Sequence, residues 1–363
     1  MLNAELQYFI LHNFLLFLVL ITAISYLTRG ANAPSIHSKT PAVLLFLFMV
    51  LIIGYRDWTS PLFGDSNTYG NYLKLATSPE SVWYSKSKLF GYIYYYWHKW
   101  NLSAESFFLL SALIYCAPMY ALSKKLKNSR SPFLPLLFFA TSLIWYSFGV
   151  NGIRNGWAFA MILWAIYYYD RPFLFYAFLA LGYAIHGSVM LTIGAICVTR
   201  YYAKPKSMLL FWLGCVLLSV IIGRYAEDIF LQYDFIAEEG EGYLSLEEEV
   251  NDDVTFSHTG FRWDFVLYSV IPILWGYYNI IKSQVKDKYY DWIFCTYVLA
   301  NAIWVLVIRA NFSNRIASLS WFLIPIVIVY PLVRMHNFRN QNQTIAITLI
   351  LYYGFTYGMW LIS

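Results

Sequence analysis

The feature that most constrains this chain is a series of long apolar runs separated by short charged or Pro/Gly-containing segments. One helical crossing of a bilayer takes roughly 20 apolar residues, because lipid leaves the backbone no hydrogen-bonding partner outside its own helix. Charged residues make up 12% of the chain, against about 25% in soluble domains. The chain is therefore expected to be a membrane protein. We expect single spans near residues 6–27, 41–55, 105–122, 132–148, 153–169, 207–224, 263–281, 289–308, 314–333 and 342–361.

Basic clusters between the spans indicate which side each connection faces. The positive-inside rule places four clusters in the cytoplasm. With these clusters in the cytoplasm, residues 173–199 must cross to the outer side of the membrane and come back. This predicts a hairpin of two short helices with His186 at its outer tip. By the same parity, residues 56–104 form an outer loop that carries an interfacial or re-entrant helix near 89–100. The clusters are Lys124, Lys125, Lys127 and Arg130; Arg200, Lys204 and Lys206; Lys282, Lys286 and Lys288; and Arg334 with Arg339.

This topology predicts one all-α transmembrane domain over residues 1–363, a polytopic helical bundle of about twelve crossings with both ends outside. An acidic outer loop at 225–261 holds 11 of the chain's 20 acidic residues, and a solvated loop is favoured over a divalent-cation site. The net charge of +5 suits cytoplasmic loops, so nucleic acid is not an expected partner. The four cysteines lie in apolar runs without metal-ligand spacing, and we expect no metal site.

Polar residues at membrane depth need a reason, because an ionisable group costs several kcal/mol there unless it is paired or faces water. On this topology they converge on the outer side, where arginine should be rare. Several converging arginines can hold a diphosphate, since each presents a planar fork of donors that stays charged. Ion pairing of Arg56 with Asp57 and of Arg262 with Asp264 would explain only part of the set. The outward residues are Arg56, Asp57, Asp65, Arg154, His186, Arg262, Asp264, Arg309 and Arg315.

Three stretches resemble the EpsG-type branch of Wzy polysaccharide polymerases. They are GYRDWTSPLFGDSNTYGNY at 54–72, NGIRNGWAFAMILWAIYYYDRPFLFYAFLALGYAIHGSVML at 151–191, and GFRWDFVLYSVIP at 260–272. The usual Arg-Gln of the second motif reads Arg154-Asn155 here, which puts the role of that amide in doubt. The residues that match the family's motifs are Arg56, Asp65 and Tyr69; Asn151, Arg154 and His186; Arg262 and Asp264; and, less securely, Arg315.

The resemblance implies a fold related to the GT-C-type lipid-sugar glycosyltransferases and a site facing the periplasm or outside. The implied protein lies in the bacterial inner membrane. It joins undecaprenyl-diphosphate-linked repeat units into O-antigen, capsule or exopolysaccharide, without a cofactor. The lipid bilayer and a chain-length regulator are the other candidate partners. Two alternatives remain: an O-antigen ligase or other lipid-linked glycosyltransferase, and a lipid-linked glycan transporter or flippase.

For this reaction we expect arginines to bind the diphosphate and one side chain to accept a proton. A histidine titrates near neutral pH, so His186 is favoured as the base, with Asp65 next and Asp264 as a third choice. Tyr69 and Asn151 are expected to contact the sugar. The diphosphate-binding residues are expected to be Arg154, Arg262 and Arg315, with Arg56 as a fourth.

Overall fold

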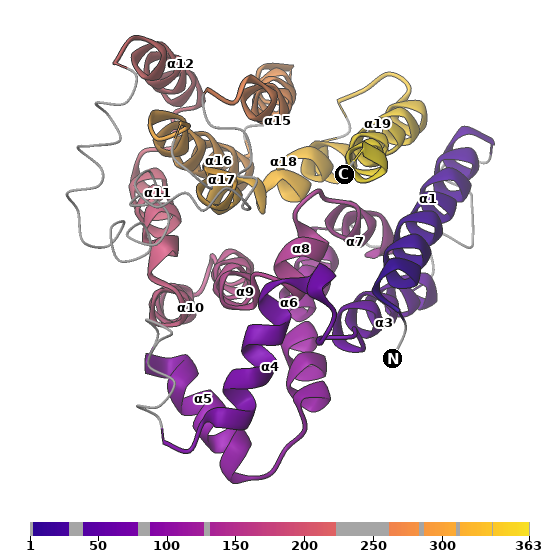
Figure 1. The fold of residues 1–363 in the computed structure, drawn as a ribbon. Helices are drawn as coiled ribbons and strands as arrows, with labels where there is room; N and C mark the ends of the chain where they lie inside the picture. The colour runs from indigo at the N-terminus through magenta and orange to yellow at the C-terminus, as the bar shows by residue number, and fades with distance from the viewer. Residues whose placement is uncertain are drawn as a thin grey trace. The chain divides into compact units, whose positions relative to one another are not determined.

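The computed structural model describes residues 3–28, 39–78, 88–126, 131–222, 261–282, 287–309, 313–335 and 337–362. Within these ranges the regular structure is helical and no strand occurs, which confirms the all-α class (Figure 1). The expected acidic loop lies almost wholly outside them. The chain divides into two compact units, Met1–His186 with Val329–Ser363, and Gly187–Ile328. Whether the two form the single transmembrane domain expected above stays a prediction.

In the first unit helices that are separated along the chain pack together, including α1 near the start and α19 near the end of the sequence. Helix α9 is its centre, because α6 and α10 both pack on it, while α3 packs on α6 and α1 packs on α19. The helices are α1 (Ala4–Thr28), α3 (Thr40–Gly54), η2 (Pro61–Phe63), α4 (Asp65–Leu75), α5 (Lys88–Lys99), α6 (Ala104–Leu126), α7 (Phe133–Ala140), α8 (Trp145–Val150), α9 (Ile153–Tyr167), α10 (Pro172–Ile185), η5 (Pro331–Met335) and α19 (Gln341–Ile362).

The second unit is organised around α16 (Lys288–Leu306), on which α11, α12, α15 and α17 pack. A buried amide holds these helices together. The Asn301 side chain donates to the Ser269 and Ser320 hydroxyls, each over 3.0 Å, and accepts from the Trp212 indole over 2.8 Å. Such interhelical hydrogen bonds stabilise helix packing where the surroundings offer no water. The other elements are η4 (Gly187–Val189), α11 (Met190–Tyr201), α12 (Pro205–Ile222), α15 (Trp263–Lys282), α17 (Ser313–Trp321) and α18 (Ile324–Tyr330).

Five of the described helical stretches are long and apolar enough to cross a membrane, namely Ala4–Thr28, Ala104–Leu126, Trp263–Lys282, Asn314–Met335 and Gln341–Ile362. Shorter apolar helices, at Thr40–Gly54, Pro172–Ile185, Gly187–Tyr201 and Pro205–Ile221, coincide with other expected spans. The protein is thus a multi-pass membrane protein. The number of about twelve crossings, their sidedness and the GT-C-type likeness stay predictions.

Two expected spans are interrupted. The run at 132–148 divides into α7 and α8, and the Thr141 hydroxyl at the break donates to the Leu137 carbonyl over 2.7 Å. The run at 314–333 divides at Phe322 and Leu323, just before Pro325. Proline has no N–H to donate to the preceding turn, so the helix cannot continue through it unchanged.

Helices also occur in the two segments that the topology predicts not to be single spans, residues 56–104 and 173–199. α5 covers the expected interfacial helix, and its Phe90 and Tyr94 are fully buried while Tyr92 and Tyr96 are exposed. In the segment 173–199, α10 ends at Ile185 and α11 follows after His186 and η4. The depth of these segments in the membrane stays a prediction.

Candidate functional site

The turn between α8 and α9 presents two of the expected site residues, Asn151 and Arg154. It is tight: the backbone N–H groups of Asn151 and Gly152 both donate to the Ser147 carbonyl, over 2.8 and 3.3 Å. Gly156 lets α9 approach this turn, because a Cβ there would lie 2.5 Å from the Phe148 carbonyl oxygen. The turn therefore fixes Arg154 in the first turn of α9.

The start of α4 docks against this turn. The Ser66 hydroxyl in its first turn donates to the Val150 carbonyl over 2.6 Å. One turn further on, the bare face of Gly70 lies directly against the Trp58 ring, where a Cβ would clash. These two contacts hold α4 so that Asp65 lies at its N-terminus and Tyr69 faces α9.

Tyr69 and Arg154 form the centre of the site in the first unit. Tyr69 is buried, and the Arg154 guanidinium donates a hydrogen bond to its hydroxyl. Burial raises the pKa of Tyr69, although the Arg154 charge opposes this effect, and Asp65 adds a smaller upward contribution. The phenol therefore stays neutral at physiological pH, and this hydrogen bond orients Arg154 without cancelling its charge.

Arg56 is placed differently, in the packed interior next to the same turn. Its side chain is 1% exposed, its Nε donates to the Ser66 hydroxyl and its Nη1 to the Ile53 carbonyl, each over 2.8 Å. Its guanidinium carbon lies 4.1 Å from the centre of the Phe108 ring. Burial lowers its pKa to about 9, which leaves it charged at neutral pH. Arg56 thus contacts α3, α4 and α6 directly, and Ser66 extends this network to α8.

The alternative explanation for Arg56, an ion pair with Asp57, does not hold in the structure. The Asp57 carboxylate accepts instead from the Thr59 hydroxyl and backbone N–H, over 2.6 and 3.2 Å. Two donors of Arg56 are used by neutral oxygens, and its Nη2 has no hydrogen-bond partner among the described residues.

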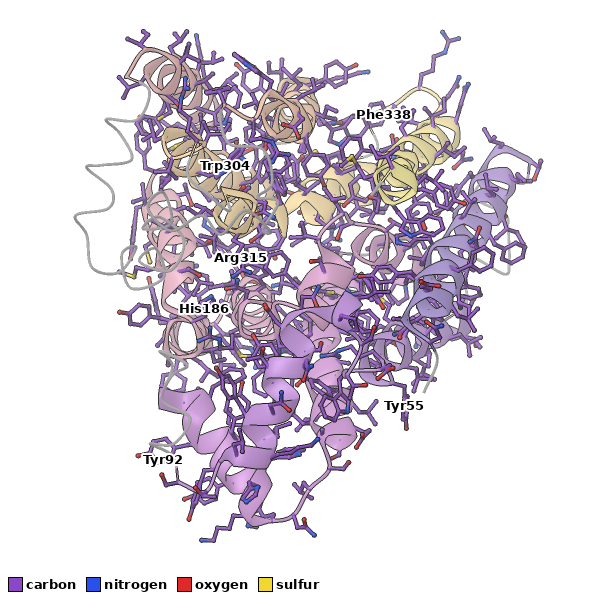
Figure 2. All side chains as sticks on the ribbon, viewed as in Figure 1. Tyr55, Tyr92, His186, Trp304, Arg315 and Phe338 are labelled. Atoms are coloured by element: carbon purple, nitrogen blue, oxygen red, sulfur yellow. The ribbon has the colours of Figure 1, made fainter. Side chains whose placement is uncertain are left out.

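His186 follows the end of α10, where the backbone turns extended at φ −154° and ψ 116°. Its side chain, labelled in Figure 2, is buried. α10 packs on α9 in the opposite direction, and Gly182 of α10 lies against Ala158 and Met161. His186 comes one turn after Gly182, which places it level with the first turn of α9. The first unit thus gathers His186, Arg154, Asn151, Asp65 and Tyr69 at one end of α9.

In the second unit the expected pair of Arg262 and Asp264 is joined in a two-pronged ion pair. Arg262 donates through Nε and Nη2 to the two carboxylate oxygens, over 2.9 and 2.6 Å. Its guanidinium carbon also lies 3.7 Å from the centre of the Phe265 ring. The ion-pair explanation considered from the sequence is therefore correct for this arginine. Its charge is largely matched by that of its partner.

Two further arginines lie at the same end of the second unit. Arg309 follows the end of α16, and its guanidinium carbon is 5.4 Å from the Phe261 ring just before α15. Arg315 lies in the first turn of α17, which begins a few residues later (Figure 2). The Trp304 ring of α16 and the Trp321 ring at the end of α17 pack against each other, 5.8 Å apart.

Sequence reasoning had placed Arg309 outward but had left it out of the diphosphate set. Its Nε is buried and has no hydrogen-bond partner in the described part of the chain. In the sequence, the polar residues that follow Arg309, up to Asn314, were the available signal. Among the residues that the structure describes, no group of three or more His, Cys, Asp or Glu side chains is placed to hold a metal ion.

The fold and these clusters define a multi-pass helical membrane protein with arginines, carboxylates and a histidine held at the ends of its helices. The family model of the EpsG family matches residues 39–363, and the chain belongs to this family. Membership points to a polysaccharide polymerase, a glycosyltransferase-like activity in general terms. No curated protein and no solved structure matches the chain.

Proposed function

We propose that this protein polymerises undecaprenyl-diphosphate-linked oligosaccharide repeat units into a bacterial surface polysaccharide, at the outer face of the inner membrane. Family membership supports the polymerase class. The observation that supports the site most directly is Arg154, whose guanidinium is oriented by the neutral Tyr69 hydroxyl beside Asp65. A hydrogen bond to a neutral phenol does not neutralise a guanidinium, and a charged guanidinium binds phosphate oxygens well.

The proposed reaction transfers a growing glycan to a new repeat unit. A hydroxyl of the acceptor sugar attacks the anomeric carbon of the donor, a new C–O bond forms, and the bond between that carbon and the diphosphate breaks. Undecaprenyl diphosphate leaves with the bonding electrons, and the hydroxyl proton passes to a base on the protein. Negative charge grows on the leaving diphosphate, so arginines placed in advance stabilise the transition state.

The structure leads us to rank the arginines. Arg154 is the first choice for the diphosphate in the first unit. In the second unit Arg315 is preferred to Arg262, because Asp264 already occupies two donors of Arg262. Arg56 is assigned to positioning, since it connects three elements in the interior. Tyr69 and Asn151 remain candidates for contacts to the sugar.

His186 and Asp65 are the candidate bases. Both belong to the first unit, at the end of α9 that carries Arg154. Asp264 is the weakest choice, because a carboxylate bound by two guanidinium donors holds a proton poorly. We expect His186→Ala or Asp65→Ala to abolish chain elongation at unchanged protein level. Full elongation by both variants would remove both residues as the base.

The deciding experiment uses the purified full chain in nanodiscs with its lipid-linked repeat unit and no divalent metal. A ladder of products on a gel identifies a polymerase, and Arg154→Ala should abolish the ladder. Arg171→Ala is the matched control, since Arg171 is exposed at the opposite end of α10 and should leave the ladder intact. A ladder from Arg154→Ala contradicts the proposed site. A single transfer onto a lipid A core acceptor indicates a ligase, and transport without chemistry indicates a flippase.

A further inference from the structure

Helix α5 places a buried hydroxyl near the Tyr69 and Arg154 pair. Tyr94 on α5 is fully buried and interacts electrostatically with both residues. Its Oη atom has no hydrogen-bond partner among the described residues. A buried polar group without a partner is costly and uncommon in folded proteins, so it calls for an explanation.

A second unsatisfied donor lies on α9 beside the first. Trp157 is three residues after Arg154, so the two side chains share one face of the helix. Its indole Nε1 is buried and also lacks a partner in the part of the chain that the structure describes. The Trp157 ring lies 5.1 Å from Phe90 and 6.3 Å from Phe107. Tyr94 contacts the same two rings, at 5.7 and 5.9 Å.

The Tyr94 hydroxyl on α5 and the Trp157 indole on α9, two neutral donors, therefore belong to side chains that pack on the same two phenylalanine rings. Arg154, which is charged, lies next to them. Neutral donors set among ring faces suit hydroxyl-rich, uncharged groups such as sugars, whereas a phosphate calls for a cation. Arg154 supplies the cation at the edge of this group. Arg154 and Asp65 are half-buried, so the group borders the accessible surface on that side.

We propose that Tyr94 and Trp157 form a subsite that binds hydroxyl oxygens of the sugar attached to the diphosphate of the lipid-linked substrate. The inference rests on the proposed function and assigns α5 a part in it. Arg154 holds the phosphate, and the two donors hold the neighbouring sugar against the Phe90 and Phe107 rings. Both donors, which have no hydrogen-bond partner among the described residues, then gain one from the substrate.

The test compares a lipid that carries the sugar with one that does not. Binding of the undecaprenyl-diphosphate-linked repeat unit, and of undecaprenyl diphosphate alone, is measured on the full chain in nanodiscs. We expect Tyr94→Phe to weaken binding of the glycan-bearing lipid about 3- to 10-fold, the usual range for one lost hydrogen bond. Binding of the bare lipid should be unchanged. Trp157→Phe should behave in the same way, and Arg154→Ala should weaken both lipids.

Tyr290→Phe is the matched control. The Tyr290 hydroxyl is also buried, but it donates to the Val327 carbonyl over 2.8 Å. This variant should lower the melting temperature and leave lipid binding unchanged. Tyr94→Phe should not lower the melting temperature, because the Tyr94 hydroxyl has no partner to lose among the residues that the structure describes.

Three results would overturn the subsite. In the first, Tyr94→Phe binds the glycan-bearing lipid as tightly as the wild type. In the second, Tyr94→Phe weakens binding of both lipids equally. In the third, Tyr94→Phe lowers the melting temperature as much as Tyr290→Phe does. Because these are binding measurements, they do not depend on elongation. Wild-type protein that binds the glycan-bearing lipid through Tyr94 but forms no ladder would contradict the polymerase and leave the subsite standing.

Discussion

The two units of the molecule both gather arginines, but they hold them with different partners. In the first unit Arg154 is oriented by a phenol, and Arg56 by a hydroxyl and a carbonyl. In the second unit Arg262 is held by a carboxylate. A neutral partner fixes the direction of a guanidinium without offsetting its charge. A carboxylate also fixes the direction, but its negative charge offsets the positive charge of the guanidinium. The group that an arginine is bonded to is therefore a better guide to anion binding than the position of the arginine in the fold.

The largest effect that this comparison predicts concerns Arg154 and Arg262. We expect Arg154→Ala to lower kcat/KM for elongation by about 100-fold or more, the usual cost of losing one donor to a developing charge. Arg262→Ala should lower kcat/KM by less than about tenfold, because its charge is matched by that of Asp264. Initial rates against lipid-linked repeat unit in nanodiscs give both values.

Lysine variants show whether charge or geometry matters at these positions. Arg154→Lys keeps the charge but loses the planar fork, so it should recover only part of the activity. A larger loss from Arg262→Ala than from Arg154→Ala would reverse the comparison and place the main anion site in the second unit.

The next effect is on stability and concerns Arg56. Arg56→Ala removes two hydrogen bonds and a ring contact, and it leaves a cavity between α3, α4 and α6. We expect the free energy of unfolding to fall by about 3 kcal/mol or more, as for other broken buried networks. Ser66→Ala should cost about 1–2 kcal/mol, since it leaves the Arg56 Nε and the Val150 carbonyl without their partner.

Thermal unfolding in detergent measures both changes, and Arg171→Ala serves as the exposed control. If Arg56→Ala abolished elongation at an unchanged melting temperature, Arg56 would belong to the binding site, as the sequence motif suggested. That result would make Arg56 functional although its side chain is almost fully buried.

A smaller effect concerns the contact that holds α4 in place. Gly70→Ala forces a Cβ against the Trp58 ring and should displace α4, which carries Tyr69. We expect a loss of about 1–3 kcal/mol in stability, typical of overpacking, together with a raised KM. Gly354→Ala is the matched control, because Gly354 is also helical but has no atom within 4 Å of an added Cβ. A melting temperature equal to that of Gly354→Ala would show that α4 tolerates the shift.

Much of this fold could be predicted because apolar length is a strong signal. The runs at 6–27 and 342–361 correspond to α1 and α19 with small differences in their ends. α4 was missed, since its sequence DSNTYGNYLKL is polar and rich in residues that favour turns. It becomes helical through its contacts with Trp58 and Val150. Such tertiary contacts leave no periodic pattern in the sequence.

The candidate site was predictable in its residues but only partly in its pairings. Tyr69 and Arg154 were both named, yet nothing in their spacing predicted their hydrogen bond. The alternative of an ion pair was right for Arg262 and wrong for Arg56, although both arginines have an aspartate within two residues. Tyr94 could not be singled out, because aromatic residues are 21% of the chain.

The smallest effect, and the sharpest test of the comparison, comes from Asp264→Asn. The change keeps the side-chain shape but removes the negative charge beside Arg262. The Arg262 side chain is 22% exposed and that of Asp264 57%, so solvent screens the pair and its contribution is about 0–1 kcal/mol.

Releasing Arg262 should therefore tighten binding of undecaprenyl diphosphate only about two- to threefold at low salt, with the gain lost as ionic strength rises. Binding curves at two salt concentrations measure it. Loss of all elongation in Asp264→Asn would instead identify Asp264 as the base. Its ion pair with Arg262 would then have to open during the reaction, and the second unit would carry the chemistry that we assign to the first.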